Sequence, residues 1–191
     1  MGQSHFLYDV DQSWTLFLDR DGVLNQRIPG SYVKNIRDFE ILPGVLEALY
    51  NLKDSFLRMV VVTNQQGVGK GYMTEEDVRI VHEYFLHEAR NAHVEIDEIY
   101  FSPDLASLPS STRKPQIGMA LQAQRDFPEI DLHKSIMVGD SRSDMEFGRN
   151  AGMKTVLVGE KGDQMSTELV DLKVKDLYTF SLLLQSAQSK K

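Results

Sequence analysis

The chain has 191 residues, of which 26% are charged and 41% belong to the hydrophobic set AVILMFWYC. These values are typical of a globular protein and exclude a disordered chain, a fibre and a collagen. Asp and Glu number 28 against 21 Lys and Arg, a formal net charge of −7, so the overall basic footprint of nucleic-acid-binding proteins is absent. The lack of cysteine excludes disulfides, cysteine nucleophiles and thiolate zinc sites. No apolar run could span a bilayer and no secretory signal is evident, so we expect a cytoplasmic protein.

Apolar runs and helical patterns alternate along most of the chain. Residues 1–13 are polar, and we expect them to form an N-terminal tail or a docking strand. No linker divides residues 14–191, which we therefore expect to be a single domain. Short apolar runs predict strands at residues 14–18, 57–63, 95–102, 135–138 and 154–158. Apolar spacing and helix-start residues predict helices over about residues 43–52, 74–89, 115–127, 143–150 and 174–187.

This alternation predicts an α/β fold, namely a doubly wound parallel sheet with helices on both faces. The run LRMVVVT at 57–63 is continuously apolar, as expected for a strand that is covered on both sides. In such a sheet, ligands bind outside the carboxyl ends of the strands. The residues that follow each predicted strand are therefore the first candidates for a functional site.

Side chains that could bind a ligand or take part in catalysis lie at or after the ends of four of the predicted strands. In chain order they are Asp19, Asp21, Thr63, Lys114, Asp140 and Asp144. Clustered carboxylates need a cation, and oxygen ligands favour Mg²⁺. A magnesium ion with open positions, beside a lysine and a short hydroxyl, would bind phosphate. One carboxylate could then attack phosphorus to form an aspartyl-phosphate, and a second could protonate the leaving oxygen and later activate water.

Four motifs in order resemble those of the haloacid dehalogenase (HAD) superfamily. They read DRDGV at 19–23, TN at 63–64, KP at 114–115 and GDSRSD at 139–144. Two longer stretches, LDRDGVLN at 18–25 and TNQQGVGKG at 63–71, are similar to the branch of small-capped histidinol phosphatases and D-glycero-D-manno-heptose 1,7-bisphosphate phosphatases. The resemblance covers roughly residues 14–160 and implies a Rossmann-like HAD domain.

The resemblance also implies a role for each acidic residue and for the lysine. Asp19 would be the nucleophile and a Mg²⁺ ligand, and Asp21 the general acid and base, with its backbone carbonyl on the metal. Asp140 would be a further ligand. Asp144 would orient Lys114 or support the metal through water, and Lys114 would neutralise the phosphoryl group. The expected cofactor is Mg²⁺, with the ligand set Asp19, Asp21, Asp140 and Asp144.

Further residues are implied as contacts of the substrate. Thr63 would hydrogen-bond the transferring phosphoryl group together with the Asn64 backbone, and Arg113 would bind substrate. The loop at 65–71 would border the substrate through Gln65, with Lys70 as a second-phosphate contact, although a flexible turn is the alternative reading of this glycine-rich segment.

The sequence departs from this branch in two places. Members of the branch usually carry a Cys/His zinc loop before the Arg-Lys motif, but residues 102–112 contain neither residue, so we expect no structural zinc. Ser141 stands where the heptose branch often has lysine. The five histidines form no metal-binding pattern, and we expect most of them at the surface.

The sequence therefore predicts a Mg²⁺-dependent phosphomonoester hydrolase that acts on D-glycero-D-manno-heptose 1,7-bisphosphate. The segment at 25–42 is too short for a large cap domain, so the site is predicted to have a minimal cap or none. Histidinol phosphate, another small phosphomonoester or a nucleic-acid 3′-phosphate are alternative substrates, and a non-catalytic phosphate binder or an aspartate-phosphorylated switch is the rival class. We expect a small-molecule partner, no nucleic acid, no membrane, and a monomer rather than an obligate oligomer.

Overall fold

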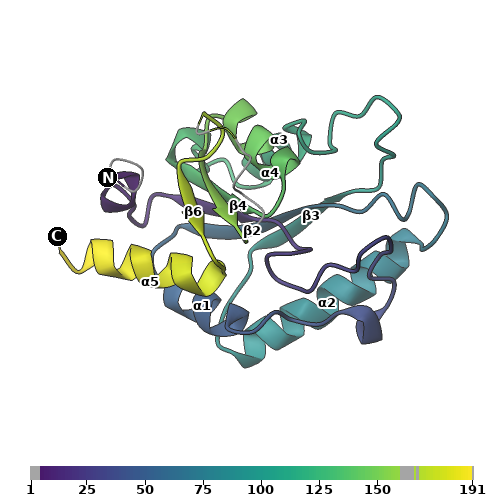
Figure 1. The fold of residues 1–191 in the computed structure, drawn as a ribbon, viewed down its shortest axis with the longest axis horizontal. Coiled ribbons are helices and arrows are strands. Elements are labelled where there is room, and N and C mark those ends of the chain that lie inside the picture. The colour runs from purple at the N-terminus through teal and green to yellow at the C-terminus, as the bar shows by residue number, and fades with distance from the viewer. Residues whose placement is uncertain (1–4, 160–165, 167, 191) are drawn as a thin grey trace.

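A six-stranded parallel sheet forms the centre of the protein in the computed structural model, which describes residues 5–159, 166 and 168–190 (Figure 1). The strand order is β3-β2-β1-β4-β5-β6. The strands are Thr15–Leu18 (β1), Arg58–Asn64 (β2), Glu98–Ser102 (β3), Ser135–Gly139 (β4), Lys154–Val158 (β5) and Leu172–Val174 (β6). The predicted doubly wound parallel sheet is thereby confirmed.

Helices cover both faces of this sheet. They are Val45–Leu52 (α1), Glu75–Asn91 (α2), Gly118–Asp126 (α3), Arg142–Asn150 (α4) and Leu177–Gln188 (α5), with 3-10 turns at His5–Tyr8 (η1), Ile36–Asp38 (η2) and Leu132–Lys134 (η3). Helices α1, α2 and α5 lie on one face and α3 and α4 on the other (Figure 1). Within the described part of the chain, no helix is both long and apolar enough to cross a membrane.

The apolar residues of the strands alternate between two cores. Leu16 and Leu18 of β1 pack with residues of α1, α2 and α5, whereas Phe17 between them packs with residues of α3 and α4. Successive side chains of a strand point to opposite faces, so a continuous apolar run serves both cores.

Several predicted boundaries were wrong: strand β3 begins at Glu98 rather than at Glu95, and two helices also begin later than predicted. The predicted final helix began at residue 174, but Val174 ends strand β6 and α5 begins at Leu177, after the N-cap Asp176. A three-residue edge strand is too short to produce a periodic pattern. Helix α3 begins at Gly118 rather than at Pro115, because the chain first makes a turn in which the Gln116 amide donates to the Arg113 carbonyl.

The described part of the N-terminal segment packs against the domain. Phe6, Leu7 and Val10 are buried, and the η1 turn lies against α5. The segment therefore docks through a 3-10 turn rather than through a strand. Residues 1–4 of the predicted tail lie outside the described residues.

The connection between β1 and α1 contains no separate cap domain. The only helix or strand described in it is the short turn η2. Isolated β-bridges pair Asn25 with Asp21 and with Ile41, which folds this connection back over the end of β1. The prediction of a minimal cap or none is confirmed, and the loop itself forms a wall of the pocket described below.

Helix α4 approaches the sheet closely at Gly148. A Cβ at this position would lie 2.6 Å from Cγ2 of Thr155 and 3.0 Å from Cβ of Met137. We expect Gly148→Ala to lower the free energy of unfolding by about 1–3 kcal/mol, because overpacking separates helix and sheet. Denaturant unfolding measures this. Glu146→Ala, which removes only an accessible ion pair with Arg142, should cost less than about 1 kcal/mol. Equal stabilities of the two variants would contradict the prediction.

Candidate active site

The predicted catalytic residues meet at the carboxyl end of the sheet, beside the central strand β1. Asp19 directly follows β1, Asp140 follows β4, and Thr63 lies near the end of β2. The chain runs outward from β1 through β2 to β3 and then crosses back to β4 on the other side of β1, so the strand order reverses at this point. A pocket of about 480 Å³ opens here.

Lys114 forms the buried centre of the site. Its Nζ lies 2.8 Å from Oδ1 of Asp19, 2.6 Å from Oδ1 of Asp144 and 2.7 Å from the Val62 carbonyl oxygen. The ammonium group has three protons, so these three acceptors match its full donor capacity. Lys114, Asp19 and Asp144 are at most 5% exposed, so this ion triad is shielded from water.

Burial and charge shift the pKa values of these groups in opposite directions. Burial together with the charge of Asp144 raises the pKa of Asp19, and Lys114 opposes the rise. Burial lowers the pKa of Lys114, but the charges of Asp144 and Asp19 outweigh it and leave that pKa above the ordinary value. Lys114 is therefore a permanent cation beside the nucleophile candidate.

Asp21 is held by three side chains. The Arg20 guanidinium donates to both carboxylate oxygens at 3.1 and 3.0 Å, Asn25 Nδ2 donates at 2.9 Å and Gln65 Nε2 at 2.9 Å. Burial raises the pKa of Asp21, but the Arg20 charge and these hydrogen bonds outweigh it and place that pKa below the ordinary value. Asp21 is therefore ionised in this arrangement.

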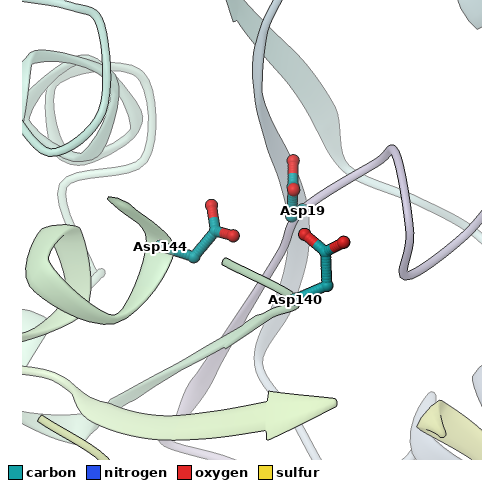
Figure 2. Close-up of side chains that lie close together, drawn as sticks. All are labelled: Asp19, Asp140 and Asp144. Carbon is teal, nitrogen blue, oxygen red and sulfur yellow. The ribbon is translucent and has the colours of Figure 1, made fainter. Parts of the chain in front are cut away.

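The oxygen ligands that Mg²⁺ prefers converge at this point. Carboxylate oxygens of Asp19, Asp140 and Asp144 lie within 4.8 Å of one another (Figure 2). The Arg27 guanidinium donates to Oδ1 of Asp140 at 2.8 Å and to the Asp21 carbonyl at 3.2 Å. The positive charge of Arg27 thus lies between two of the oxygens that were predicted to bind the metal. Because these oxygens already attract a cation, the residues present fit Mg²⁺.

The contacts of Asp144 favour one of its two predicted roles. Its Oδ2 accepts hydrogen bonds from the Ser141 amide at 3.0 Å and from Ser141 Oγ at 2.5 Å, while Oδ1 lies against Lys114. Both oxygens are engaged, and the residue is buried in the first turn of α4. This geometry favours the orientation of Lys114 over direct metal ligation.

Two of the predicted substrate-binding residues, Gln65 and Asn64, form hydrogen bonds with other residues of the site. Gln65 is buried, lies outside the pocket lining, and donates from Nε2 to Thr63 Oγ1 at 2.8 Å as well as to Asp21. The Asn64 side chain accepts from the Lys114 amide at 2.9 Å and donates to the Lys114 carbonyl at 3.1 Å. The side-chain amides of Gln65 and Asn64 thus hold Asp21, Thr63 and Lys114 in place. Asn64 and Thr63 also line the pocket.

Three cationic side chains besides Lys114 are among the residues that line the pocket. The predicted contacts Lys70 and Arg113 are both among the lining residues, and so is Arg27, which the sequence analysis missed. Arg27 lies in an irregular loop that returns to the site only through the bridges of Asn25, so no motif or periodicity marks it.

Asp104 organises the loop at residues 102–112, where no structural zinc was expected. Its Oδ2 accepts from Ser110 Oγ at 2.5 Å, Thr112 Oγ1 at 3.0 Å and Ser102 Oγ at 3.3 Å. The Asp104 carbonyl accepts from the Arg113 guanidinium at 3.2 Å. A carboxylate surrounded by hydroxyl groups thus holds the loop that carries Arg113.

Four of the five histidines are exposed, as expected, and His82 of α2 is the exception. It is 6% exposed, and its Nε2 lies 3.1 Å from Nη1 of Arg20. Burial and the Arg20 charge lower the pKa of His82 to about 3. Its position on the inner face of α2 could have been read from the buried neighbours Val78 and Phe85, which share its helical stripe.

Comparisons with known proteins agree with this geometry. A HAD-hydrolase-like family model matches residues 111–180. A D-glycero-alpha-D-manno-heptose-1,7-bisphosphate 7-phosphatase of Mycobacterium bovis is 37% identical over 93% of this chain and 95% of its own length, and one of Campylobacter jejuni is 41% identical over 76% and 83%. The crystal structure of D,D-heptose 1,7-bisphosphate phosphatase from B. bronchiseptica, complexed with magnesium and phosphate, has a TM-score of 0.82 at 27% identity and covers 91% of this chain and 98% of its own.

Fold, site and relatives together define a HAD-type phosphatase. The chain belongs to the HAD-like hydrolases, in the same family as these heptose bisphosphate phosphatases.

The acidic site gives a prediction on metal-free stability. Burial, with repulsion from Asp144, raises the pKa of Asp140 to about 6, despite the Arg27 charge. A carboxyl group whose pKa is raised on folding contributes stability that is lost as the pH rises from about 4 through 6. At pH 7.5 we therefore expect metal-free Asp140→Asn to melt at a higher temperature than the wild type, and Mg²⁺ to raise the melting temperature of the wild type only. An equal Mg²⁺ shift in both proteins would contradict the assignment.

The Asp104 cluster gives a prediction on local order. Asp104→Ala removes the shared acceptor, so we expect faster amide hydrogen exchange at residues 105–113 with little change in β1 or β4. Asp104→Asn keeps one carbonyl acceptor and should give a smaller effect. Unchanged exchange in this loop in the alanine variant would show that the cluster does not order it.

Proposed function

We propose that the protein is a Mg²⁺-dependent phosphomonoester hydrolase that forms an aspartyl-phosphate on Asp19. The observation that carries this proposal is the buried contact of Lys114 Nζ with Asp19 at 2.8 Å. Both hydrogen bonds described for the Asp19 carboxylate, from Lys114 and from the Arg20 amide, end on Oδ1. We assign the attack on phosphorus to Oδ2.

Charge stabilisation is the main contribution of the chain to this reaction. A phosphoryl group that passes from substrate to Asp19 carries negative charge on its non-bridging oxygens. Lys114 faces these oxygens as a fixed cation, and the Thr63 hydroxyl has a proton to donate, because its oxygen already accepts from Gln65. Asp19, Asp140 and the Asp21 carbonyl would hold Mg²⁺, which supplies further charge neutralisation when bound.

Asp21 transfers the protons of both half-reactions in this proposal. It donates a proton to the leaving oxygen as the P–O bond breaks and later takes a proton from the water that hydrolyses the aspartyl-phosphate. Its three hydrogen-bond donors favour the ionised form that the second step needs. The charge of a bound phosphate raises the pKa of Asp21 and so favours the protonated form that the first step needs.

We propose D-glycero-D-manno-heptose 1,7-bisphosphate as the substrate. The support is the set of curated relatives named for this activity, which match up to 93% of the chain. The pocket also contains Arg27, Lys70 and Arg113 in addition to Lys114, more cations than one phosphoryl group requires. A second phosphate on the same small molecule accounts for them. Arg27 would be available to the substrate if Asp140 held Mg²⁺, because the two cations would compete for the same carboxylate.

The test is phosphate release with and without Mg²⁺ from a panel of substrates. The panel holds the α and β anomers of the heptose 1,7-bisphosphate, histidinol phosphate and a 3′-phosphorylated oligonucleotide. We expect one heptose anomer to have the highest kcat/KM and Asp19→Asn to show no release above background, because it lacks the nucleophile. The matched control Asp54→Asn, at an exposed position, should retain full activity.

Other outcomes would contradict defined parts of the proposal. Comparable slow release from every substrate would reject the heptose assignment. Full activity in Asp19→Asn would reject the aspartyl-phosphate mechanism. An acid-stable phosphate on Asp19 that persists for minutes, without release, would favour the switch over the hydrolase.

A further inference from the structure

Among the residues that the structure describes, Arg20 is the largest fully buried side chain, and it belongs to neither the expected metal ligands nor the pocket lining. It lies between the two aspartates of the first motif and is 1% exposed. The Cζ of its guanidinium lies 5.9 Å from the centre of the Phe39 ring. A buried guanidinium is costly unless it is hydrogen-bonded, so the partners of Arg20 define what it does.

The described partners of the guanidinium are two. Its Nη2 donates to both oxygens of Asp21, and its Nη1 lies 3.1 Å from Nε2 of His82. Arginine has donors only, so the Nε2 of His82 must accept and carries no proton. Because burial and the Arg20 charge lower the pKa of His82 to about 3, the ring stays neutral at physiological pH and remains an acceptor.

His82 is fixed in turn by the fold. It lies on the inner face of α2, 62 residues after Arg20, and its ring meets Phe101 edge to face at a centroid distance of 5.8 Å. The ring nitrogen therefore has a defined place on a rigid helix. This arrangement couples the packing of α2 to the orientation of the Asp21 carboxylate through one guanidinium.

We propose that His82 is a positioning residue for the reaction: its neutral ring nitrogen fixes the Arg20 guanidinium, which holds the carboxylate of Asp21 in place for proton transfer. This inference rests on the proposed function, because it assigns His82 to the general acid and base of that reaction. Without an acceptor at position 82, Nη1 of Arg20 is buried and unsatisfied, and the guanidinium turns away from Asp21 to find one.

The test compares two substrates that differ in their need for a general acid. When the P–O bond of a sugar phosphate breaks, the sugar would leave as a strongly basic alkoxide and so needs the proton of Asp21, whereas 4-nitrophenyl phosphate releases a stable phenolate and does not need it. The constant kcat/KM reports on the steps up to the first phosphoryl transfer. Dividing the kcat/KM of one substrate by that of the other cancels the fraction of enzyme that is folded. The quotient therefore separates an effect on positioning from a loss of stability.

Three variants make the comparison. His82→Phe keeps an aromatic ring but removes the acceptor, His82→Gln restores an acceptor oxygen, and His87→Gln is the matched control at an exposed position of the same helix. General acid catalysis contributes about 10²–10⁴-fold. We expect His82→Phe to lower kcat/KM for the sugar phosphate by about tenfold or more, with less than about a threefold change for 4-nitrophenyl phosphate. His82→Gln should recover most of the loss, and His87→Gln should match the wild type.

Two results would overturn the inference. An equal loss of activity of His82→Phe on both substrates would assign His82 to stability alone, and no loss on either would remove it from the reaction. A wild-type enzyme that releases no phosphate from either substrate would instead reject the proposed function, so the two failures are distinguishable.

Discussion

The ion triad of Lys114, Asp19 and Asp144 is the constraint on which the rest of the site depends. Burying an ammonium group and two carboxylates is costly, and only close pairing with full hydrogen bonding offsets that cost. Lys114 must therefore be held in one position, and hydrogen bonds from separate segments of the chain hold it there. Asn64 binds its backbone on both sides, and Ser141 holds Asp144 in the first turn of α4.

The sheet explains why these distant residues can meet. Strands β1, β2 and β4 are neighbours and parallel, so the residues after their carboxyl ends reach one edge of the sheet together. These three strands are almost entirely buried, so the charged side chains of the site follow their carboxyl ends, where the chain leaves the sheet. Loop residues between β1 and α1 then complete the pocket without a cap domain. Such an open site is consistent with a small phosphorylated substrate that is held by charge more than by enclosure.

A set of side chains beneath the pocket gives the reacting groups their orientation. Gln65 joins Thr63 to Asp21, Arg20 joins Asp21 to His82 of α2, and the Asp104 cluster holds the loop that carries Arg113. In each case the hydrogen bonds described for the joining side chain go to other groups of the protein. In the proposed reaction the Asp21 carboxylate would be preorganised, since its donors are fixed before substrate arrives.

The sequence by itself determined five of the six strands, the order of the motifs and the residues at the strand ends, because these follow from short local patterns and the two-residue period of a strand. Asp19, Asp140 and Lys114 could be identified in this way. Only the tertiary structure decided that Gln65 faces Asp21 rather than the pocket, that Arg27 reaches Asp140, and that His82 is buried against Arg20. Those contacts join residues up to 113 positions apart, and no local pattern encodes the path of an irregular loop or the partner of a buried guanidinium.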